Sequence, residues 1–535
     1  MKKAILITLL TLTILTVLSQ KWEQIIGQPN QNESSRRIIE HYDKGYVITA
    51  TFTAGYDDGH GWLIKTDING NVLWSKILGI DPDQVIIEKT VYDTDGNLYI
   101  FGLLWKGVIG PDWPLVVKLN ACGEKQWCAH LTFTENEYGY FTDGILLDNG
   151  DLLGLASMPD AEQHDMIYLF CISPDGEYKW KKSYASKDNY PYFAMRLGSR
   201  IQKINDIYII SGYVYSPYPG GDTNHVYQRP MFIGIDTLFN EQWVLEFGIE
   251  DSLIGKALTS IAIKDSLIMG VGIYKHSGFY DAWAMYYNNE GEEVGNCIFT
   301  NDMFAPEIEK TAFYDVQRVN DSLFLAALGF CYEGNNDRIT GEMVFDTGCN
   351  VSKYEIRDGI KNGTRHLMKT FDGKYVIATS SLDNNLNRDI YFYKINENLE
   401  HDTVYPGSYT YDSLCTSLPI QSGTIDLAGC DIITRLEEIP WLEDYNKREN
   451  TIVITAYPNP ATDGFVTLGF TNTGNYEDME LKCFDVFGEL VHKEKVYQYQ
   501  GETKLDVGNW SKGMFVGGIY SNGLLLGNCK FIIKQ

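Results

Sequence analysis

The chain has 535 residues, with 44 basic and 71 acidic side chains and a formal net charge of −27. This length exceeds one ordinary hydrophobic core and predicts either several domains or a large domain built from repeats. The charge argues against nucleic acid and anionic membrane surfaces as partners, because both would repel the chain.

The N-terminus has the layout of a secretory signal. Two lysines precede an apolar run at residues 4–18, and small side chains then permit cleavage near Ser19 or Gln20. The run is shorter than the roughly 20 apolar residues that a membrane-spanning helix needs. We therefore expect residues 1–19 to be a signal peptide that directs the chain to the periplasm, and we expect no transmembrane span in the mature chain.

Residues 45–79 contain a pattern of strands and turns that recurs in the following part of the chain. β-Branched and aromatic residues alternate at 46–50 and at 62–66, as they do in half-buried strands. Asn69 and Gly70 then favour a tight hairpin turn before the next strand. The strand pattern of residues 45–50 recurs at 97–103, 151–157, 206–214, 266–274, 322–330 and 374–381.

A tryptophan after the hairpin turn is the second repeated feature. Trp74, Trp127 and Trp180 each follow a turn glycine at the same short distance, and Trp243 follows a turn without glycine. The last three units lack this tryptophan. We expect these indoles to pack between neighbouring units.

The repeats predict a ring. Seven units of about fifty residues cannot bury their faces singly, so they must pack on one another. A circular arrangement of four-stranded units removes long exposed edges. We therefore predict an all-β fold, with a seven-bladed β-propeller of four-stranded blades at residues 26–407. An open solenoid is the alternative, but it would need capping units, and the sequence shows none.

Export makes the ten cysteines candidates for disulfides. The expected pairs are Cys122 with Cys128, Cys331 with Cys349, Cys415 with Cys430, and Cys483 with Cys529. Cys171 and Cys297 are then left over, buried or paired with each other. The sequence has no C-x-x-C or clustered histidine pattern for zinc, and we expect no metal and no other cofactor.

Residues 408–450 lose the strand pattern and gain acidic residues and proline, which predicts a linker. The alternative is an extension packed on the propeller, which the cysteines and the apolar residues 439–442 would favour.

Residues 451–535 predict a small antiparallel β-sandwich. Its marked residues are Pro458, Asn459 and Pro460 after a strand, Asp463 and Gly464 at the next turn, Gly488 in a hairpin at 485–489, Gly513 before the final strands, and Lys530 near the end. In these residues the segment resembles the type A C-terminal sorting domain of the type IX secretion system of Bacteroidota. The repeats before it are similar to secreted bacterial repeats that share no common activity. A plain carbohydrate-binding sandwich is the alternative.

The resemblance implies a delivery route. Members of the family cross the inner membrane on the N-terminal signal, and the outer-membrane machinery then recognises the C-terminal domain and commonly removes it. The resemblance therefore implies that the protein passes through the periplasm and is secreted or held at the cell surface, with that machinery as a partner.

Loops between the second and third strands of each unit should open on one face of the ring. Their aromatic, acidic and histidine side chains suit stacking and hydrogen bonding to a glycan or protein ligand. The candidate binding residues are Tyr56, Asp58, His60, Trp105, His164, His225, His276 and Tyr280. The alternative is that these are ordinary solvated loop residues.

The sequence contains no phosphate-binding loop, no H-E-x-x-H and no G-x-S-x-G motif. We therefore expect a secreted or cell-surface binding or adhesion module and assign no catalytic residue. The alternative is a secreted glycoside hydrolase acting on polysaccharide, because 71 acidic residues leave room for a pair of catalytic carboxylates. Three or more convergent carboxylates with displaced pKa values at the centre of the ring would favour the hydrolase.

Overall fold

The computed structural model describes residues 20–29, 31–53, 59–79, 83–106, 112–131, 139–159, 165–184, 200–217, 226–247, 254–264, 266–276, 279–332, 339–361, 366–382, 387–407, 409–433, 452–472, 479–485, 490–496, 500–521 and 524–534. The chain forms two compact units, Met1–Ile439 and Pro440–Gln535. Both are built from strands, and the one helix within the described ranges is the short 3-10 helix η1 (Asn301–Met303).

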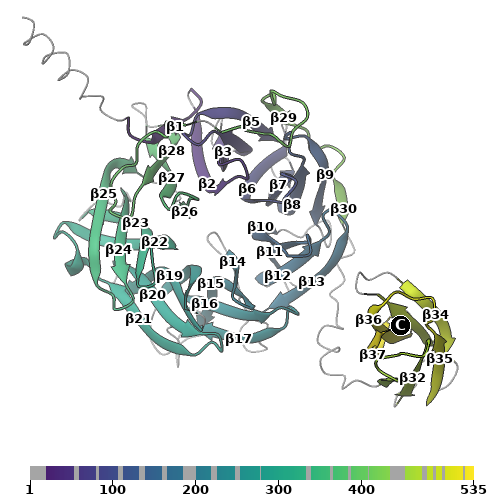
Figure 1. Cartoon of the computed structure of the whole chain (residues 1–535). Coiled ribbons are helices and arrows are strands. Elements are labelled where there is room, and N and C mark those ends of the chain that lie inside the picture. The colour runs from purple at the N-terminus through teal and green to yellow at the C-terminus, as the bar shows by residue number, and fades with distance from the viewer. Residues whose placement is uncertain are drawn as a thin grey trace, which may run out of the picture. The chain divides into compact units, whose positions relative to one another are not determined.

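The first unit is a ring of seven sheets, each with four antiparallel blade strands, and these strands run from the axis outward in chain order in the first six blades (Figure 1). Blade 1 contains β2 (Asn32–Glu40), β3 (Tyr46–Thr53), β4 (Gly59–Thr66) and β5 (Val72–Leu78). Blade 2 contains β6 (Asp83–Tyr92), β7 (Leu98–Lys106), β8 (Asp112–Leu119) and β9 (Lys125–Leu131). Blade 3 contains β10 (Tyr140–Leu146), β11 (Leu152–Pro159), β12 (Asp165–Ile172) and β13 (Tyr178–Tyr184).

The next three blades follow the same plan. Blade 4 contains β14 (Arg200–Ile204), β15 (Ile207–Pro217), β16 (Val226–Asp236) and β17 (Glu241–Glu246). Blade 5 contains β18 (Ile254–Lys264), β19 (Leu267–His276), β20 (Phe279–Asn288) and β21 (Glu293–Phe299). Blade 6 contains β22 (Ile308–Arg318), β23 (Leu323–Tyr332), β24 (Ile339–Asp346) and β25 (Val351–Lys361).

The seventh blade closes the ring with strands from both ends of the propeller sequence. It contains β26 (His366–Lys369), β27 (Tyr375–Leu382) and β28 (Arg388–Ile395), and its outer strand is β1 (Glu23–Ile26), which pairs antiparallel with β28. This pairing between the first strand and the last blade does not occur in a linear stack. The predicted seven-bladed propeller of four-stranded blades is therefore confirmed.

Tryptophans fasten outer strands to the next blade, as the sequence predicts. The indole N–H of Trp127 donates to the carbonyl oxygen of Pro174 at 3.0 Å, and that of Trp243 donates to Asn289 at 2.7 Å. Each acceptor lies in the hairpin turn of the following blade. Glycine is needed in this turn, because a Cβ on Gly176 would lie 2.9 Å from the Trp127 ring.

The seventh blade, whose own repeat lacks the tryptophan, receives one from the N-terminal segment. Trp22 precedes β1, is 1% exposed, and donates its indole N–H to the carbonyl oxygen of Ile68 at 2.9 Å. Ile68 lies in the blade 1 turn at the place that Pro174 occupies in the blade 3 turn. The same hydrogen bond, from an indole N–H to a carbonyl oxygen of the next hairpin turn, is thus present where the ring closes.

The other two units without the tryptophan use different chemistry at this joint. Cys297 of β21 is bonded to Cys349 in the hairpin turn of blade 6. Cys349 has a φ of 68°, the left-handed conformation that glycine adopts in the equivalent turns. Between blades 6 and 7, the Lys353 ammonium donates to the carbonyl oxygen of Asn398.

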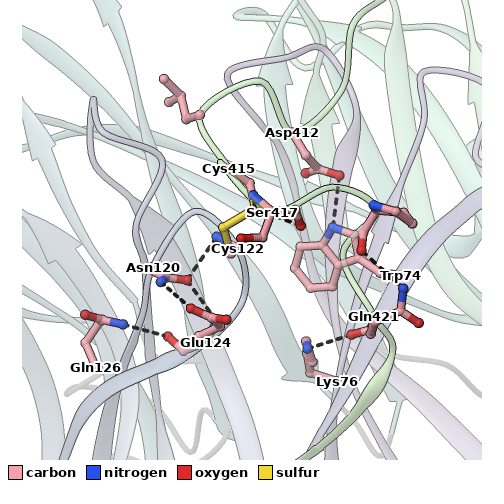
Figure 2. Close-up of a disulfide and its surroundings, with 12 residues drawn as sticks. Trp74, Lys76, Asn120, Cys122, Glu124, Gln126, Asp412, Cys415, Ser417 and Gln421 are labelled. Carbon is pink, nitrogen blue, oxygen red and sulfur yellow. Dashed lines mark hydrogen bonds between the residues drawn. A yellow bond between two sulfur atoms is a disulfide. The ribbon is translucent and has the colours of Figure 1, made fainter.

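Residues 409–433 pack along the outer edges of blades 1 and 2, and we call them the strap. Its strands β29 (Gly423–Ile425) and β30 (Asp431–Ile433) pair parallel with β5 and β9. Figure 2 shows Trp74 donating its indole N–H to Asp412 of the strap, at 3.1 Å. The segment expected as a linker is therefore, through residue 433, the packed extension that was its alternative.

The expected pairs Cys122–Cys128 and Cys415–Cys430 are wrong. The structure bonds Cys122 to Cys415 (Figure 2). It also bonds Cys128 to Cys430, so two disulfides tie the strap to blade 2. Within the blade 2 hairpin, the residue opposite Cys128 is Val117, and Cys122 lies in the turn, so the two cysteines do not face each other.

The expected pairs Cys331–Cys349 and Cys483–Cys529 are also wrong. Cys349 bonds Cys297 instead, and β24 separates Cys331 from Cys349 along blade 6. Cys483 and Cys529 each face Gly517, so a whole strand lies between them. The left-over Cys171 is buried and has a free thiol.

The second unit is a two-sheet sandwich. One sheet contains β31 (Ile452–Tyr457), β32 (Phe465–Asn472) and β35 (Gln500–Asp506). The other has the order β34 (Leu490–Val496), β33 (Met479–Phe484), β36 (Gly513–Ser521) and β37 (Leu524–Ile533). Apolar side chains from both sheets form one core, among them Leu468, Leu481, Phe515 and Phe531. The predicted C-terminal antiparallel β-sandwich is confirmed.

Trp22→Ala should lower the free energy of unfolding by about 3–5 kcal/mol, because it leaves a cavity at the ring closure and removes the bond to Ile68. Urea titration of the full chain measures this change. Leu238→Ala, at a side chain 61% exposed, is the control and should shift it by less than about 0.5 kcal/mol. Equal urea midpoints for Trp22→Ala and the parent would show that this indole does not hold the ring.

Cys122→Ser combined with Cys415→Ser should lower the free energy of unfolding by about 2–5 kcal/mol, because the strap then loses a covalent tie to blade 2. The control is Cys171→Ser, which breaks no disulfide. Non-reducing peptide mapping of the parent should recover Cys122 linked to Cys415. Recovery of Cys122 linked to Cys128 would contradict the strap geometry.

Candidate functional site

The innermost strands surround the propeller axis and share a local irregularity (Figure 1). In five of them the register with the second strand shifts by one residue, which marks a β-bulge. A bulge changes the direction of nearby side chains and is frequent at functional sites. The residues that follow the five bulges are Arg37, Lys89, Asp143, Thr259 and Asp315.

Ion pairs between blades that are not neighbours show that these side chains converge. Arg37 of blade 1 lies 4.0 Å from Asp143 of blade 3, and Arg200 of blade 4 lies 2.6 Å from Asp315 of blade 6. Lys89 of blade 2 also lies 3.6 Å from Asp143. We call the whole group the axial cluster, which comprises Arg36, Arg37, Glu88, Lys89, Asp143, Arg200, Asp315 and His366.

Two carboxylates of the axial cluster also accept hydrogen bonds from main-chain N–H groups. Asp143 accepts the N–H of Ile201 at 3.0 Å, and Asp315 accepts the N–H of Leu367 at 3.0 Å. An innermost strand has no further strand to receive its edge N–H groups, so these side chains supply the acceptors. The carboxylates are accordingly withdrawn from solvent.

The cations of the axial cluster outnumber its carboxylates, and the two most exposed side chains among these charged groups are cations. Four cations and three carboxylates leave an excess of one positive charge, in a chain of net charge −27. Arg36 and Lys89 each keep 20% of their side-chain surface exposed, whereas Asp143 and Asp315 keep 2% and 3%. The solvent-accessible part of the axial cluster therefore contains more positive than negative side-chain surface, although Glu88 also keeps 13% of its side-chain surface exposed.

Burial changes the pKa values of three side chains in the axial cluster, Arg37, Lys89 and Glu88. Burial and the positive charge of Arg200 lower the pKa of Arg37 to about 10, and burial also lowers the pKa of Lys89. Burial raises the pKa of Glu88. Each of these pKa shifts disfavours the charged form of its side chain. A negative charge added near Arg37 and Lys89 would therefore stabilise their protonated forms.

His366 is held neutral within the axial cluster. Burial first, and then the positive charges of Arg37 and Arg200, lower its pKa well below the usual value. Its Nδ1 accepts the N–H of Ile38 at 3.3 Å and its Nε2 lies 3.5 Å from an oxygen of Asp315, so the proton belongs on Nε2. Both ring nitrogens are therefore engaged.

The loop residues predicted as a binding face are described only in part. Tyr56, Asp58, His164 and His225 lie outside the described residues. His60 lies in β4, Trp105 in β7, His276 in β19 and Tyr280 in β20. These four belong to blades 1, 2 and 5, and their grouping as one face stays a prediction.

The residues predicted for export and sorting lie at the two ends of the chain. Ser19 and Gly488 are outside the described residues, whereas the carbonyl oxygen of Gln20 accepts the N–H of Val404 at 3.1 Å. Pro458, Asn459 and Pro460 follow β31, Gly513 begins β36, and Lys530 lies in β37.

Asn459 fastens the last strand of the sandwich. Its side-chain nitrogen donates to the carbonyl oxygen of Lys530 at 3.0 Å, and its side-chain oxygen accepts the N–H of Ile532 at 2.9 Å. The marked Asn between two prolines thus covers the free edge of β37.

Sequence reasoning missed the axial cluster. Its members are spread over six blades, and only closure of the ring brings them together. A signal was present, because Arg37, Lys89, Asp143 and Asp315 occupy the same place in their repeats, immediately after a bulge. An alignment of the first strands, rather than of the second strands, would have found it.

Comparison with known proteins identifies the C-terminal part of the chain. A family model for the secretion system C-terminal sorting domain matches residues 455–534. No curated protein sequence matches the chain. Within the described ranges, the structure contains no helix of the length and apolar character that crossing a membrane requires.

Solved structures similar to the chain include a protein of unknown function from Dyadobacter fermentans, with 10% identity, 63% of this chain and 99% of that chain covered, and a TM-score of 0.39. A polysaccharide lyase of family PL25, an ulvan lyase, has 11% identity, covers 70% and 96%, and has a TM-score of 0.45. The β-propeller domain of the Trilobed protease from Pyrococcus furiosus has 9% identity, covers 72% and 99%, and has a TM-score of 0.38. At such identities and TM-scores, nothing about ligand or activity follows for this chain.

The matched domain directs proteins through the type IX secretion system. This chain is therefore a seven-bladed β-propeller protein that carries a secretion-system C-terminal sorting domain and is exported to the cell surface or the medium.

Proposed function

We propose that the exported propeller is an extracellular binding module whose axial cluster holds the carboxylate or sulfate group of an anionic polymer. The observation that carries the proposal is the order of charges at the axis. The cations Arg36 and Lys89 keep 20% of their side-chain surface exposed, whereas Glu88 keeps 13% and Asp143 and Asp315 keep 2% and 3%. Guanidinium and ammonium groups bind carboxylates and sulfates through charge-assisted hydrogen bonds.

Two arginine donors support the same ligand chemistry. The Nε–H groups of Arg36 and Arg200 are buried and have no hydrogen-bond partner among the described residues. An unsatisfied buried donor costs about 1–3 kcal/mol. An oxyanion that reached these groups would recover part of that energy.

The net charge of the chain limits the kind of polymer. A charge of −27 repels polyanions at long range, so only short-range contacts at the axis can favour binding. A polymer with widely spaced anionic groups is repelled less by the chain than a densely charged polymer, and it can still place one anionic group against the axial cations.

Three carboxylates converge at the axis, which meets part of the expectation for a glycoside hydrolase, but their contacts support this alternative less. Such an enzyme needs one carboxyl that holds a proton and a second that is free to act as base or nucleophile. Asp143 and Asp315 are committed to main-chain N–H groups and to cations. Glu88 has a raised pKa but lies 3.6 Å from Arg36.

Binding of the full chain from Gln20 onward to immobilised polymers tests the proposal. We expect hyaluronan, with one carboxylate in every second sugar, to bind and uncharged dextran not to bind. Binding to heparin tests whether a densely sulfated polymer is also a ligand, and binding to poly-glutamate tests whether the carboxylates of a peptide are. Retention should fall as salt is raised, because the contact is ionic. Equal retention of dextran and hyaluronan, or release of reducing ends from hyaluronan, would contradict a binding role at the axial cluster.

Arg36→Gln combined with Lys89→Gln should weaken hyaluronan binding at least about tenfold, since two charge-assisted contacts are lost. Lys203→Gln, which removes an exposed lysine paired with Asp148 outside the axial cluster, should leave it unchanged. Isothermal titration with a short hyaluronan fragment measures both affinities. An unchanged affinity in the double variant would place the ligand elsewhere.

Affinity for a sulfated polymer should rise as the pH is lowered from 7. Burial raises the pKa of Glu88 above its usual value, so this carboxyl takes up a proton at a higher pH than an ordinary glutamate and then leaves the neighbouring cations with less counter-charge. His366 does not titrate near its ordinary pKa, because burial and the positive charges of Arg37 and Arg200 lower that pKa. Glu88→Gln should therefore bind more tightly at pH 7 and show a flatter pH profile. A profile that Glu88→Gln leaves unaltered would exclude this carboxyl as the titrating group.

A further inference from the structure

The outer face of the four-stranded sheet in the sorting domain carries an apolar surface at one end. Register places Leu490 beside Phe484, Phe484 beside Val516, and Met514 beside Ile532. Leu490, Met514 and Ile532 are 47%, 43% and 40% exposed, and the other two are half-buried. We call these five residues the apolar end.

Alternation along the strands shows that the apolar end is one continuous face. Phe515 lies between Met514 and Val516 and is 2% exposed, and Phe531 precedes Ile532 and is 0% exposed. Both phenylalanines point into the core of the sandwich. Neighbours in a strand point to opposite faces, so Met514, Val516 and Ile532 point outward together.

The rest of the same face is polar, which confines the apolar surface to one end. Lys482 lies 3.2 Å from Glu480, and Lys493 lies 2.9 Å from another oxygen of the same carboxylate. At the border of the apolar end, Lys530 is exposed and is the register partner of Val516. The surface is thus apolar with one cationic corner.

The marked residues of the sorting domain hold this surface in place. Asn459 fixes β37 at Lys530 and Ile532 through two hydrogen bonds of its side chain. Gly513 begins β36 with a φ of 151°, which L side chains rarely adopt, and Met514 follows it directly. Their role is to position the strands, and the side chains displayed next to them are the exposed apolar ones.

We infer that the apolar end, together with Lys530, is the surface by which the outer-membrane machinery of the secretion system grips the folded domain. The domain belongs to a family defined by sorting, so a protein partner must recognise it. Contiguous exposed apolar side chains with a charged rim are typical of protein interfaces. The partner surface that fits is an apolar seat with an acidic group opposite Lys530. This inference does not depend on the ligand of the axial cluster.

Export of charged variants from a host with a type IX system tests the inference. Met514→Asp and Ile532→Asp should each lower the surface plus medium fraction of the full chain about tenfold and raise the periplasmic fraction, because a carboxylate would be buried at the interface. Met514→Leu, which keeps the apolar contact, should be exported like the parent. Lys530→Glu should also reduce export, because it places like charges opposite each other.

The matched control is Phe465→Asp on the other sheet. Phe465 is 42% exposed, close to the 43% of Met514, but the Lys504 ammonium lies 4.3 Å from its ring centre. This variant should be exported normally. Urea midpoints of the variants purified from the periplasm verify the fold, and Met514→Ser provides a milder test if the aspartate variants unfold.

Three results would overturn the inference. The first is parental export of Met514→Asp and Ile532→Asp. The second is retention of Phe465→Asp to the same degree as these variants. The third is parental export of the apolar-end variants together with loss of a dimer in sedimentation, which would assign the surface to a second copy of the chain.

Discussion

A ring of sheets is stable only when every blade is fastened to the next, since one open joint would expose two apolar sheet faces to water. In this protein the fasteners lie where an outer strand meets the following hairpin turn. Indole N–H groups of Trp22, Trp127 and Trp243 donate to carbonyl oxygens of that turn. The disulfide between Cys297 and Cys349 occupies the same joint between blades 5 and 6. The same two segments meet at each of these joints, but the contact is an indole hydrogen bond in three of them and a disulfide in the fourth.

The axial cluster follows from the same closure. A closed ring leaves each innermost strand with an unpaired edge, and acidic side chains such as Asp143 and Asp315 accept N–H groups at that edge. Buried carboxylates then require cations nearby, which Arg37, Lys89 and Arg200 supply. Because the cations are in excess, a requirement of folding also creates a positively charged site in an acidic protein.

Local features of the sequence predicted the strands, the turns and the number of blades, because alternation and turn chemistry act over a few residues. Contacts between distant segments could not be predicted in this way. Cys122 and Cys415 are separated by 293 positions, so the shorter hairpin pairing was the natural but wrong choice. Trp22 precedes the first repeat and takes the place of a residue missing from the last one. Its role becomes visible only when β1 is paired with β28.

The sorting domain separates structural from displayed residues in the same way. Asn459 and Gly513, which mark the sequence resemblance, act on the main chain of β36 and β37. The aromatic residue Phe515 after Gly513 is buried in the core, whereas Met514 between them is exposed. Such residues identify the fold of the domain, and they hold in place exposed apolar side chains that the motif does not include. In the proposed interface, recognition therefore depends on Met514 and Ile532 as well as on the motif residue Lys530.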